Sequence, residues 1–296
     1  MRTYEQSRGR NGIAVALALA LLTMAVACGT QDSDVAGPSP SASASEEVEA
    51  SPTASSSPTP TTPPAGEERC SGYGEPVDAE PAYVHQDESR RLYALHAGTG
   101  TRGVVLIHGS GLRGLCVWYR ELGWLPKEGF RVVAYDRDCV GASDCGDPTD
   151  GLADLNAIIA DLTERGARDV VVVGASAGAP DVIVAAARPD SPLRGTVALS
   201  PFGLSQPPVS GEFETYEAAA REAKVPVLYV LAEDDTAATA GELRDLAAVT
   251  RPAGSKAIVL PAGTGHAQQV LYADAEQTAP SAFRTEFLTF LRTHTS

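Results

Sequence analysis

The sequence predicts an α/β fold, with a mainly parallel central sheet covered by helices on both faces. Between residues 70 and 296, short β-branched apolar runs alternate with stretches whose apolar residues recur at helical spacing. Such alternation is typical of parallel sheets. The runs Gly103–Ile107 and Val170–Val173 are continuously apolar, as strands buried on both faces are. No internal repeat or second linker interrupts the pattern, so one domain accounts for residues 70–296.

The expected elements follow in chain order. Strands are expected at 91–97, 103–107, 130–135, 170–173, 195–199, 226–231 and 256–260. Helices are expected around 118–128, 152–165, 177–187, 214–223, 241–248 and 280–293, where apolar residues recur every three or four positions. Only about 26 residues separate the strand ending near Leu199 from the one starting at Pro226. We therefore expect no large lid domain.

Residues 1–27 have the layout of an export signal. Three arginines lie in the first ten residues, and an uncharged apolar run covers residues 13–27. That run is too short to be a stable membrane-spanning anchor. The boundary Ala25-Val26-Ala27-Cys28 resembles the lipobox of bacterial lipoproteins, although Ala25 stands where such boxes more often have Leu. The resemblance implies a lipidated Cys28 that anchors the exported chain on the extracytoplasmic face of the cell membrane. Ordinary secretion, with Cys28 incidental, is the alternative.

Residues 28–69 consist mainly of Ser, Pro, Thr, Ala and Glu, with few apolar residues to bury. Such a composition cannot offset its conformational entropy by packing, so it predicts a disordered tether. The net charge of the whole chain is −15. This charge argues against nucleic acid as a partner, because nucleic acid selects basic surfaces.

Four cysteines lie in the predicted domain: Cys70, Cys116, Cys139 and Cys145. An even number in an exported domain favours disulfides over metal or redox chemistry. Their spacing fits no common zinc pattern, and we expect neither a metal nor a cofactor. Three pairings are possible. Pairing Cys139 with Cys145 would close a short loop and leave Cys70 to pin the domain's first segment near Cys116.

The segment Gly174–Gly178 (GASAG) follows a β-branched strand and precedes a predicted helix. In that context G-x-S-x-G forms a sharp turn that exposes the Ser hydroxyl as a nucleophile. Glycines on both sides avoid collisions with neighbouring elements, and the helix N-terminus favours developing negative charge. Ser176 is therefore the candidate nucleophile. A tight turn with a capping Ser is the purely structural alternative.

The segment 108–111 (HGSG) directly follows the strand at 103–107. A glycine-rich loop at the end of a strand can point backbone N–H groups at one oxygen, as acyl transfer requires. Here the chain resembles the α/β-hydrolase superfamily, in which an HG-x-G loop supplies one oxyanion donor. The resemblance continues through Tyr135-Asp136-Arg137 and the segment 141–144 (GASD), with Cys139 where the family's loop usually has its first Gly.

The resemblance implies specific roles for residues of these loops. The oxyanion donors would be the backbone N–H groups of Ala177 and Ser110, with Gly111 as the alternative to Ser110. His108 would have a structural role and no part in proton transfer.

A Ser nucleophile needs a base, and the α/β-hydrolase order is Ser, then acid, then His. After the strand at 226–231, the segment Ala232-Glu233-Asp234-Asp235 resembles the family's G-x-x-D turn. Register favours Asp235 as the acid, with Asp234 and then Glu233 as alternatives. The Gly-rich loop after the last strand ends in His266. Of the five histidines, His266 alone stands where the family places its base.

These motifs predict a serine hydrolase that forms an acyl-enzyme through Ser176, His266 and Asp235. A small-molecule or lipid-like carboxylic ester is the expected substrate. The alternatives are a peptidase or amidase of the same fold, and a non-catalytic surface lipoprotein that retains the scaffold. The sequence does not indicate an oligomeric state.

Overall fold

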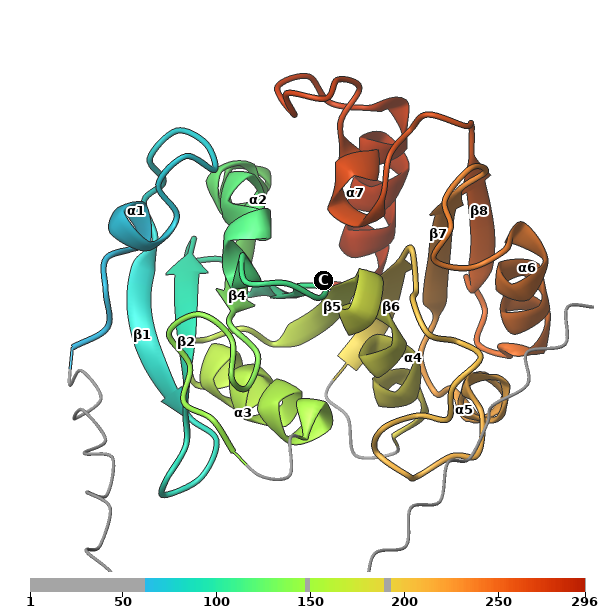
Figure 1. Cartoon of the computed structure of the whole chain (residues 1–296), viewed down its shortest axis with the longest axis horizontal. Coiled ribbons are helices and arrows are strands. Elements are labelled where there is room, and N and C mark those ends of the chain that lie inside the picture. The colour runs from blue at the N-terminus through green and yellow to red at the C-terminus, as the bar shows by residue number, and fades with distance from the viewer. Residues whose placement is uncertain (1–61, 147–149, 189–192, 296) are drawn as a thin grey trace, which may run out of the picture. The chain divides into compact units, whose positions relative to one another are not determined.

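The computed structural model describes residues 62–146, 150–188 and 193–295 (Figure 1). The predicted signal peptide, Cys28 and most of the predicted tether lie outside these residues. Within the described ranges, no helix combines the length and the apolar character that crossing a membrane requires.

The described residues form one eight-stranded sheet in the order β1-β2-β4-β3-β5-β6-β7-β8. Its strands are β1 (Glu80–His85), β2 (Arg91–Ala97), β3 (Arg102–Ile107), β4 (Phe130–Tyr135), β5 (Asp169–Ala175), β6 (Leu193–Leu199), β7 (Val227–Ala232) and β8 (Lys256–Leu260). β1 pairs with β2, and β2 with β4, in antiparallel fashion, and the remaining pairs are parallel. The predicted mainly parallel sheet is confirmed.

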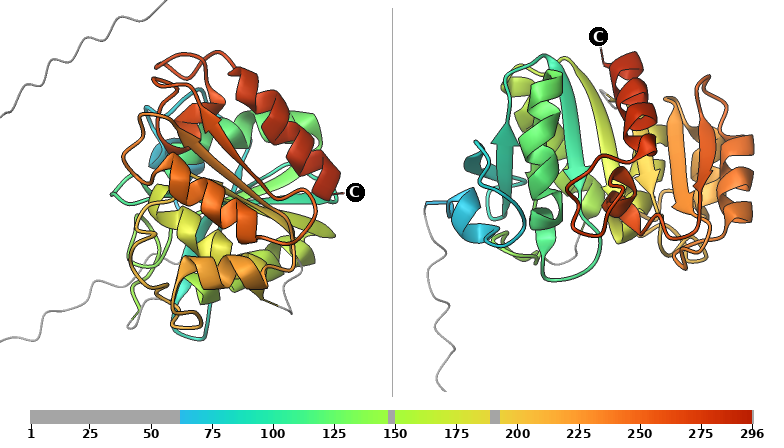
Figure 2. Two further views of the ribbon diagram at one scale, coloured as in Figure 1. Left: turned by 90° about the vertical axis from the view of Figure 1, so that its right-hand side faces the viewer. Right: turned by 90° about the horizontal axis from the view of Figure 1, so that it is seen from above.

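Helices cover both faces of the sheet (Figures 1 and 2). One face packs on α3 (Gly151–Glu164), α4 (Ala179–Ala187), α5 (Tyr216–Glu222) and α6 (Ala240–Val249). The other packs on α2 (Tyr119–Trp124) and α7 (Ala282–His294). Each face therefore has its own hydrophobic core, which is why the central strands are apolar at nearly every position.

Short helical segments complete the described chain. They are α1 (Gly66–Arg69) and the 3₁₀ turns η1 (Gly114–Trp118), η2 (Leu125–Glu128), η3 (Ser176–Gly178) and η4 (Ala267–Leu271). The helix expected around 118–128 is thus divided into α2 and η2. Pro126 stands at the start of η2, where its missing N–H donor removes a bond that a continuous helix would need.

β1 was not predicted from the sequence. Its second residue is Pro81, and a proline normally argues against a strand. β1 is the edge strand of the sheet, where a missing backbone donor is tolerated.

Among the described residues, regular structure is already present ahead of the predicted boundary at residue 70. α1 lies inside the segment predicted to be a disordered tether. Arg69 forms an ion pair with the buried Asp136 at 3.2 Å, and Cys70 forms a disulfide with Cys116. These two attachments hold α1 to the domain. A second disulfide joins Cys139 to Cys145 in the loop after β4.

Because β3 to β8 run parallel, their carboxyl ends meet at one edge of the sheet. This edge is where open α/β sheets place their functional sites. The loops that leave it include those after β3, β5, β7 and β8, which carry all the candidate catalytic and oxyanion-hole residues.

Candidate active site

Ser176 lies at the junction of β5 and η3, and its φ angle is +52°. A non-glycine residue in this left-handed region costs about 1–3 kcal/mol and persists only where the surrounding structure imposes it. The strain is what a sharp turn between a strand and a helix requires. It lifts the Ser176 side chain away from the line of the strand.

Three glycines around Ser176 are needed for close packing. A Cβ on Gly174 would lie 2.3 Å from the Gly178 carbonyl oxygen, and one on Gly178 would lie 2.4 Å from the His108 carbonyl oxygen. A Cβ on Gly109 would lie 2.7 Å from the Cβ of Ser176. Real Cβ atoms are essentially never this close to another atom. The loop after β3 is therefore in direct contact with the Ser176 turn.

His108 holds the base of that loop. Its Nε2 accepts the backbone N–H of Arg137 at 3.0 Å, so the proton is on Nδ1, which donates to the Gly109 carbonyl oxygen at 2.6 Å. Burial lowers the pKa of His108 to about 4. The side chain is thus a neutral link between the loops after β3 and β4, in agreement with the structural role that the resemblance implies.

Asp136 organises the loop after β4 in a similar way. Its buried carboxylate accepts the backbone N–H groups of Leu115 and Ala142 and pairs with Arg69. Ser143 donates its hydroxyl to the Asp136 carbonyl oxygen at 2.6 Å. The residues that resemble the family's loop motif therefore act here as a scaffold behind the site.

The structure brings His266 and Asp235 together. The Nδ1 of His266 lies 2.9 Å and 3.1 Å from the two carboxylate oxygens of Asp235. The His266 side chain is 46% exposed, whereas that of Asp235 is only 3% exposed. A carboxylate can only accept, so Nδ1 carries the proton and Nε2 is left with a lone pair.

Several donors keep Asp235 ionised. Burial raises the pKa of its carboxyl, but hydrogen bonds from the Ser200 hydroxyl, the Ala237 N–H and His266 outweigh burial, and the pKa lies below its ordinary value. Asp234, the alternative acid, instead accepts the Gly263 N–H at 2.9 Å and 3.0 Å. Asp234 therefore anchors the loop that carries His266, and Asp235 contacts the imidazole itself.

Ser200, at the end of β6, is a site residue that the sequence analysis missed. It is fully buried, and its hydroxyl oxygen accepts the backbone N–H of Ala267, the residue after His266, at 2.8 Å. The same hydroxyl lowers the pKa of Asp235. In the sequence, Ser200 directly follows the expected strand at 195–199, which comes between the strands that precede Ser176 and Asp235. The position was visible from the sequence, but it holds no carboxylate that would have marked it as a site residue.

The Ser200–Ala267 bond also shows how the loop that carries His266 extends toward the end of the sheet edge where Ser176 lies. β8 is three strands away from β5 in the sheet, a distance of roughly 14 Å at the usual strand spacing. The bond shows that the loop after β8 passes back over β7 to the end of β6. On the other side, the Ser176 carbonyl oxygen accepts the backbone N–H of Phe202 at 3.2 Å.

Backbone strain gathers at these same linked positions. Among the described residues, the non-glycine residues with positive φ are Ser176, Ser200, Ala267, Cys139 and Gln277. The first three belong to the network just described. Such strain is typical of functional sites, where it is held in place by the fold.

Not every expected contact is formed. Within the described residues, the Ser176 hydroxyl makes no hydrogen bond with His266. Hydrogen bonds of this kind are often long or misaligned without substrate and tighten when it binds. The Ser110 N–H makes no backbone hydrogen bond to a described residue. Ala177 lies in the first turn of η3, where N–H groups have no partner within the helix.

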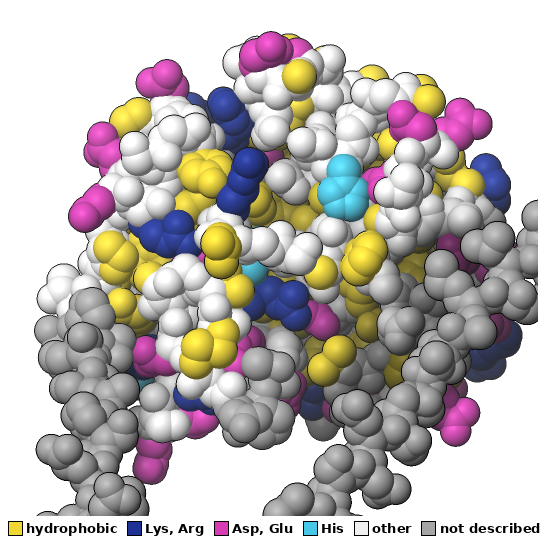
Figure 3. Space-filling model, viewed as in Figure 1, with side chains coloured by type: hydrophobic (Ala, Val, Ile, Leu, Met, Phe, Trp, Pro, Cys, Tyr) yellow, Lys and Arg dark blue, Asp and Glu magenta, His cyan; other side chains and the backbone are white. Residues whose placement is uncertain are grey.

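In the view of Figure 3, one histidine side chain stands clear at the surface, and most of the side chains around it are uncharged. In the part of the chain that the structure describes, no group of three or more His, Cys, Asp or Glu side chains is placed to hold a metal ion.

Comparison with known proteins identifies the fold. Residues 104–225 match the alpha/beta hydrolase family, a segment that includes Ser110 and Ser176 but ends before Asp235 and His266. No curated protein sequence matches the chain.

Solved structures extend the likeness across the described domain. An esterase from Pyrococcus furiosus superposes with a TM-score of 0.62 at 18% identity, covering 79% of this chain and all of the other, 100%. Est1E from Butyrivibrio proteoclasticus, solved with ferulic acid bound, superposes with a TM-score of 0.56 at 18% identity, and the match covers 72% of this chain and 98% of Est1E. Naproxen esterase from Bacillus subtilis superposes with a TM-score of 0.56 at 15% identity, and the match covers 73% of this chain and 92% of the esterase. The described chain therefore has the α/β-hydrolase fold.

Proposed function

We propose that this protein is a serine hydrolase that cleaves carboxylic esters, with Ser176 as nucleophile, His266 as general base and Asp235 as its partner. The observation that carries this proposal is the hydrogen bond between His266 Nδ1 and the buried carboxylate of Asp235. It leaves Nε2 as the basic nitrogen, on the sheet edge where the strained Ser176 turn lies.

In the proposed mechanism, His266 Nε2 takes the proton from Ser176 Oγ while Oγ bonds to the ester carbonyl carbon. The carbonyl oxygen becomes an oxyanion that accepts the N–H groups of Ser110 and Ala177, with Gly111 as the alternative to Ser110. As the C–O bond to the alcohol breaks, His266 gives its proton to the departing oxygen. Water then attacks the acyl-enzyme by the same steps, and the acid is released.

Two observations support an ester as the substrate. The structural neighbours with the same fold include esterases from two organisms, and Est1E, which was solved with ferulic acid bound. The chain between β6 and α5 contains no inserted helix among its described residues, so the site edge has no large lid. An open mouth suits small-molecule or lipid-like esters that approach from solution.

The proposal includes export and attachment. The lipobox-like Cys28 would be lipidated after removal of residues 1–27, and residues 28 to about 61 would tether the domain to the membrane. Incorporation of labelled palmitate into the full chain, and its loss in Cys28→Ala, would support the anchor. Equal labelling of both proteins would contradict it.

The catalytic proposal is tested with 4-nitrophenyl acetate and a fluorophosphonate probe. Ser176→Ala is expected to abolish hydrolysis and labelling and to leave thermal unfolding nearly unchanged, because only one hydroxyl is removed. Identification of the labelled peptide locates the nucleophile. Full activity in Ser176→Ala, or a label on another residue, would remove Ser176 from the mechanism.

A further inference from the structure

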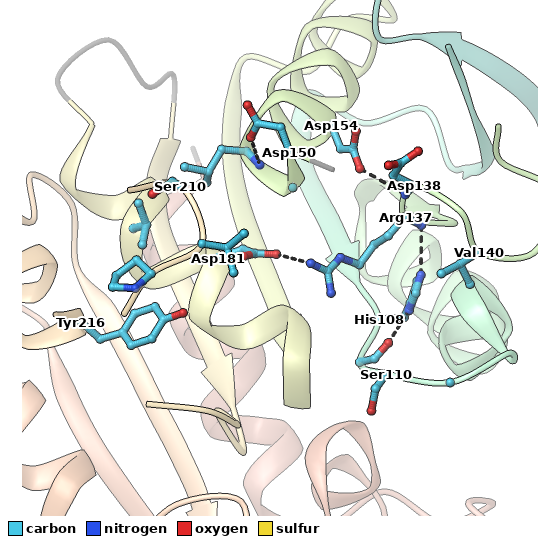
Figure 4. A pocket seen from close by; sticks show the side chains of 17 residues that line it. His108, Ser110, Arg137, Asp138, Val140, Asp150, Asp154, Asp181, Ser210 and Tyr216 are labelled. Atoms are coloured by element: carbon cyan, nitrogen blue, oxygen red, sulfur yellow. Dashed lines mark hydrogen bonds and ion pairs between the residues drawn. The ribbon is translucent and has the colours of Figure 1, made fainter. Parts of the chain in front are cut away.

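A cavity of about 490 Å³ lies beside the candidate oxyanion loop (Figure 4). It is bounded by residues 108–111 after β3, the loop after β4, the first turns of α3 and α4, and residues 208–216. Gly109, in its wall, packs directly against Ser176. The cavity therefore adjoins the Ser176 turn.

Tyr216 presents an unused hydroxyl to the cavity. The residue is 6% exposed, and in Figure 4 its hydroxyl points into the cavity toward Asp181. Among the described residues, no side chain or backbone group forms a hydrogen bond with it. Burial raises the pKa of Tyr216 to about 12, so the group stays protonated and can both donate and accept.

Arg137 and Asp181 form an ion pair in the same wall. Arg137 Nη2 donates to Asp181 Oδ2 at 2.9 Å, and Nη1 lies at the limiting distance of 3.5 Å from the Ala177 carbonyl oxygen. A guanidinium has five N–H donors, so several make no hydrogen bond to a described residue. The second oxygen of Asp181 accepts no hydrogen bond from a described residue. Both donors and acceptors are thus available close to Tyr216.

The chemistry of this wall selects among ligands. An anionic group would meet Asp138, Asp150 and Asp154, which also line the cavity. A cationic group would be attracted by these carboxylates, but it cannot accept hydrogen bonds from the remaining N–H donors of Arg137. An alkyl group would bury the free donors and acceptors without partners, at about 1–3 kcal/mol for each group. Neighbouring hydroxyls can accept from Arg137, donate to Asp181 and exchange a hydrogen bond with Tyr216.

We propose that this cavity binds a neutral, hydroxyl-rich part of the substrate, so that the preferred esters are those of a sugar or polyol. This inference rests on the proposed ester hydrolysis and names the substrate class for the same site. Arg137, Asp181 and Tyr216 are the residues that recognise the hydroxyl groups.

The test compares esters that share an acetyl group and differ in the alcohol. These are methyl 6-O-acetyl-glucoside, cyclohexylmethyl acetate, which has a ring of similar size without hydroxyls, and acetylcholine. The glucoside ester is expected to have a kcat/KM at least about 10-fold above the other two, since sites built for hydroxyls reject analogues that lack them. Equal values, or a preference for the cyclohexyl or choline ester, would overturn the inference.

Tyr216→Phe sharpens the test because the Tyr216 hydroxyl has no hydrogen-bond partner among the residues that the structure describes. The melting temperature is expected to stay the same, while the glucoside-to-cyclohexyl selectivity ratio falls about 3- to 10-fold, the value of one hydrogen bond. The matched control is Tyr229→Phe, whose hydroxyl bonds to Thr250 in the core at 2.9 Å. It should lower the melting temperature and leave the selectivity ratio unchanged. An unchanged ratio in Tyr216→Phe would count against the inference.

Failure of this inference and failure of the proposed function give different results. If 4-nitrophenyl acetate is hydrolysed through Ser176 but the selectivity is absent, only the inference fails. If no ester is hydrolysed, the proposed function fails, and binding of free methyl glucoside is measured by calorimetry on wild type and Tyr216→Phe. Binding that weakens in the variant supports the cavity's role without catalysis, and no binding to either protein overturns it.

Discussion

Ser200 Oγ accepts the backbone N–H of Ala267 at 2.8 Å, and this bond ties the end of β6 to the loop that carries His266. Ser200 is buried, has a φ of +49°, and also lowers the pKa of Asp235. One hydroxyl thus holds both the acid and the segment that begins immediately after the base. We infer that Ser200 is a positioning residue for the proposed triad.

Ser200→Ala should therefore impair catalysis without touching substrate. We expect kcat to fall about 10- to 100-fold with little change in KM, because small displacements of reacting groups have effects of this size. Steady-state kinetics with 4-nitrophenyl acetate measure both parameters.

Ser255→Ala is the matched control for that experiment. Ser255 also accepts a backbone N–H, from Val227 at 3.2 Å, and donates to the Pro252 carbonyl oxygen, but it lies before β8, at the opposite edge of the sheet from His266. Its removal should lower stability and leave kcat unchanged. If both variants lose stability and neither loses kcat, Ser200 is only a structural residue.

The two neighbouring aspartates should differ sharply in their effects. Asp235→Asn removes the charge that holds the His266 tautomer and should lower kcat by about 10³–10⁴-fold, as in other triads. Asp234→Asn makes the same isosteric exchange but alters only the contact with Gly263, so the decrease in kcat should be far smaller. Comparable kinetics for the two variants would argue against Asp235 as the partner of His266.

Gly109→Ala tests the contact between the loop after β3 and the nucleophile. The added Cβ would lie 2.7 Å from the Ser176 Cβ and 3.3 Å from its Oγ. We expect a kcat at least about 100-fold lower and a stability loss of about 1–3 kcal/mol from overpacking. Activity assays and thermal melts report the two effects separately.

Gly241→Ala is the control for added bulk. It lies in α6, where the nearest atom to a new Cβ is Thr239 Oγ1 at 3.7 Å. That substitution should leave activity unchanged and stabilise the helix by up to about 1 kcal/mol. Normal activity in Gly109→Ala would mean that the loop yields and does not shape the site.

Glu121 gives the protein a pH-dependent stability. Burial raises the pKa of Glu121 from 4.5 to about 7, and the Tyr272 hydroxyl donates to Oε1 at 2.5 Å. A raised pKa means that the folded state binds the proton more tightly than the unfolded state. This contribution is complete below pH 4.5 and is lost as the pH rises through about 7.

Glu121→Gln should therefore flatten the stability curve between pH 4.5 and 7. The amide cannot ionise, so unfolding in urea at a series of pH values should show a smaller decline than in wild type. Tyr272 directly follows η4, the turn that begins immediately after His266. Its buried contact with Glu121 therefore anchors the chain that follows His266. A decline as steep as that of wild type would show that Glu121 does not titrate in this range.

The sequence by itself determined the alternation of strands and helices, and with it the order of the loops that carry Ser176, Asp235 and His266. Continuous apolar strands and helical spacing are local patterns, so each can be predicted from a few neighbouring residues. The Gly-rich turns were predictable for the same reason, since they need residues without a Cβ at fixed positions. β1 was not predicted because Pro81 is tolerated only in an edge strand, and the neighbouring residues do not reveal whether a strand will lie at the edge of the sheet.

Only the tertiary structure decided which side chains meet. It brought Asp235 and not Asp234 to His266, paired the four cysteines, and placed Ser200 between the acid and the His266 loop. It also brought Tyr216, Arg137 and Asp181 to one cavity from three different segments. Apart from the disulfide between Cys139 and Cys145, which are 6 positions apart, these contacts join residues from about 30 to about 80 positions apart. Their geometry follows from how strands and helices pack, which no short stretch of sequence records.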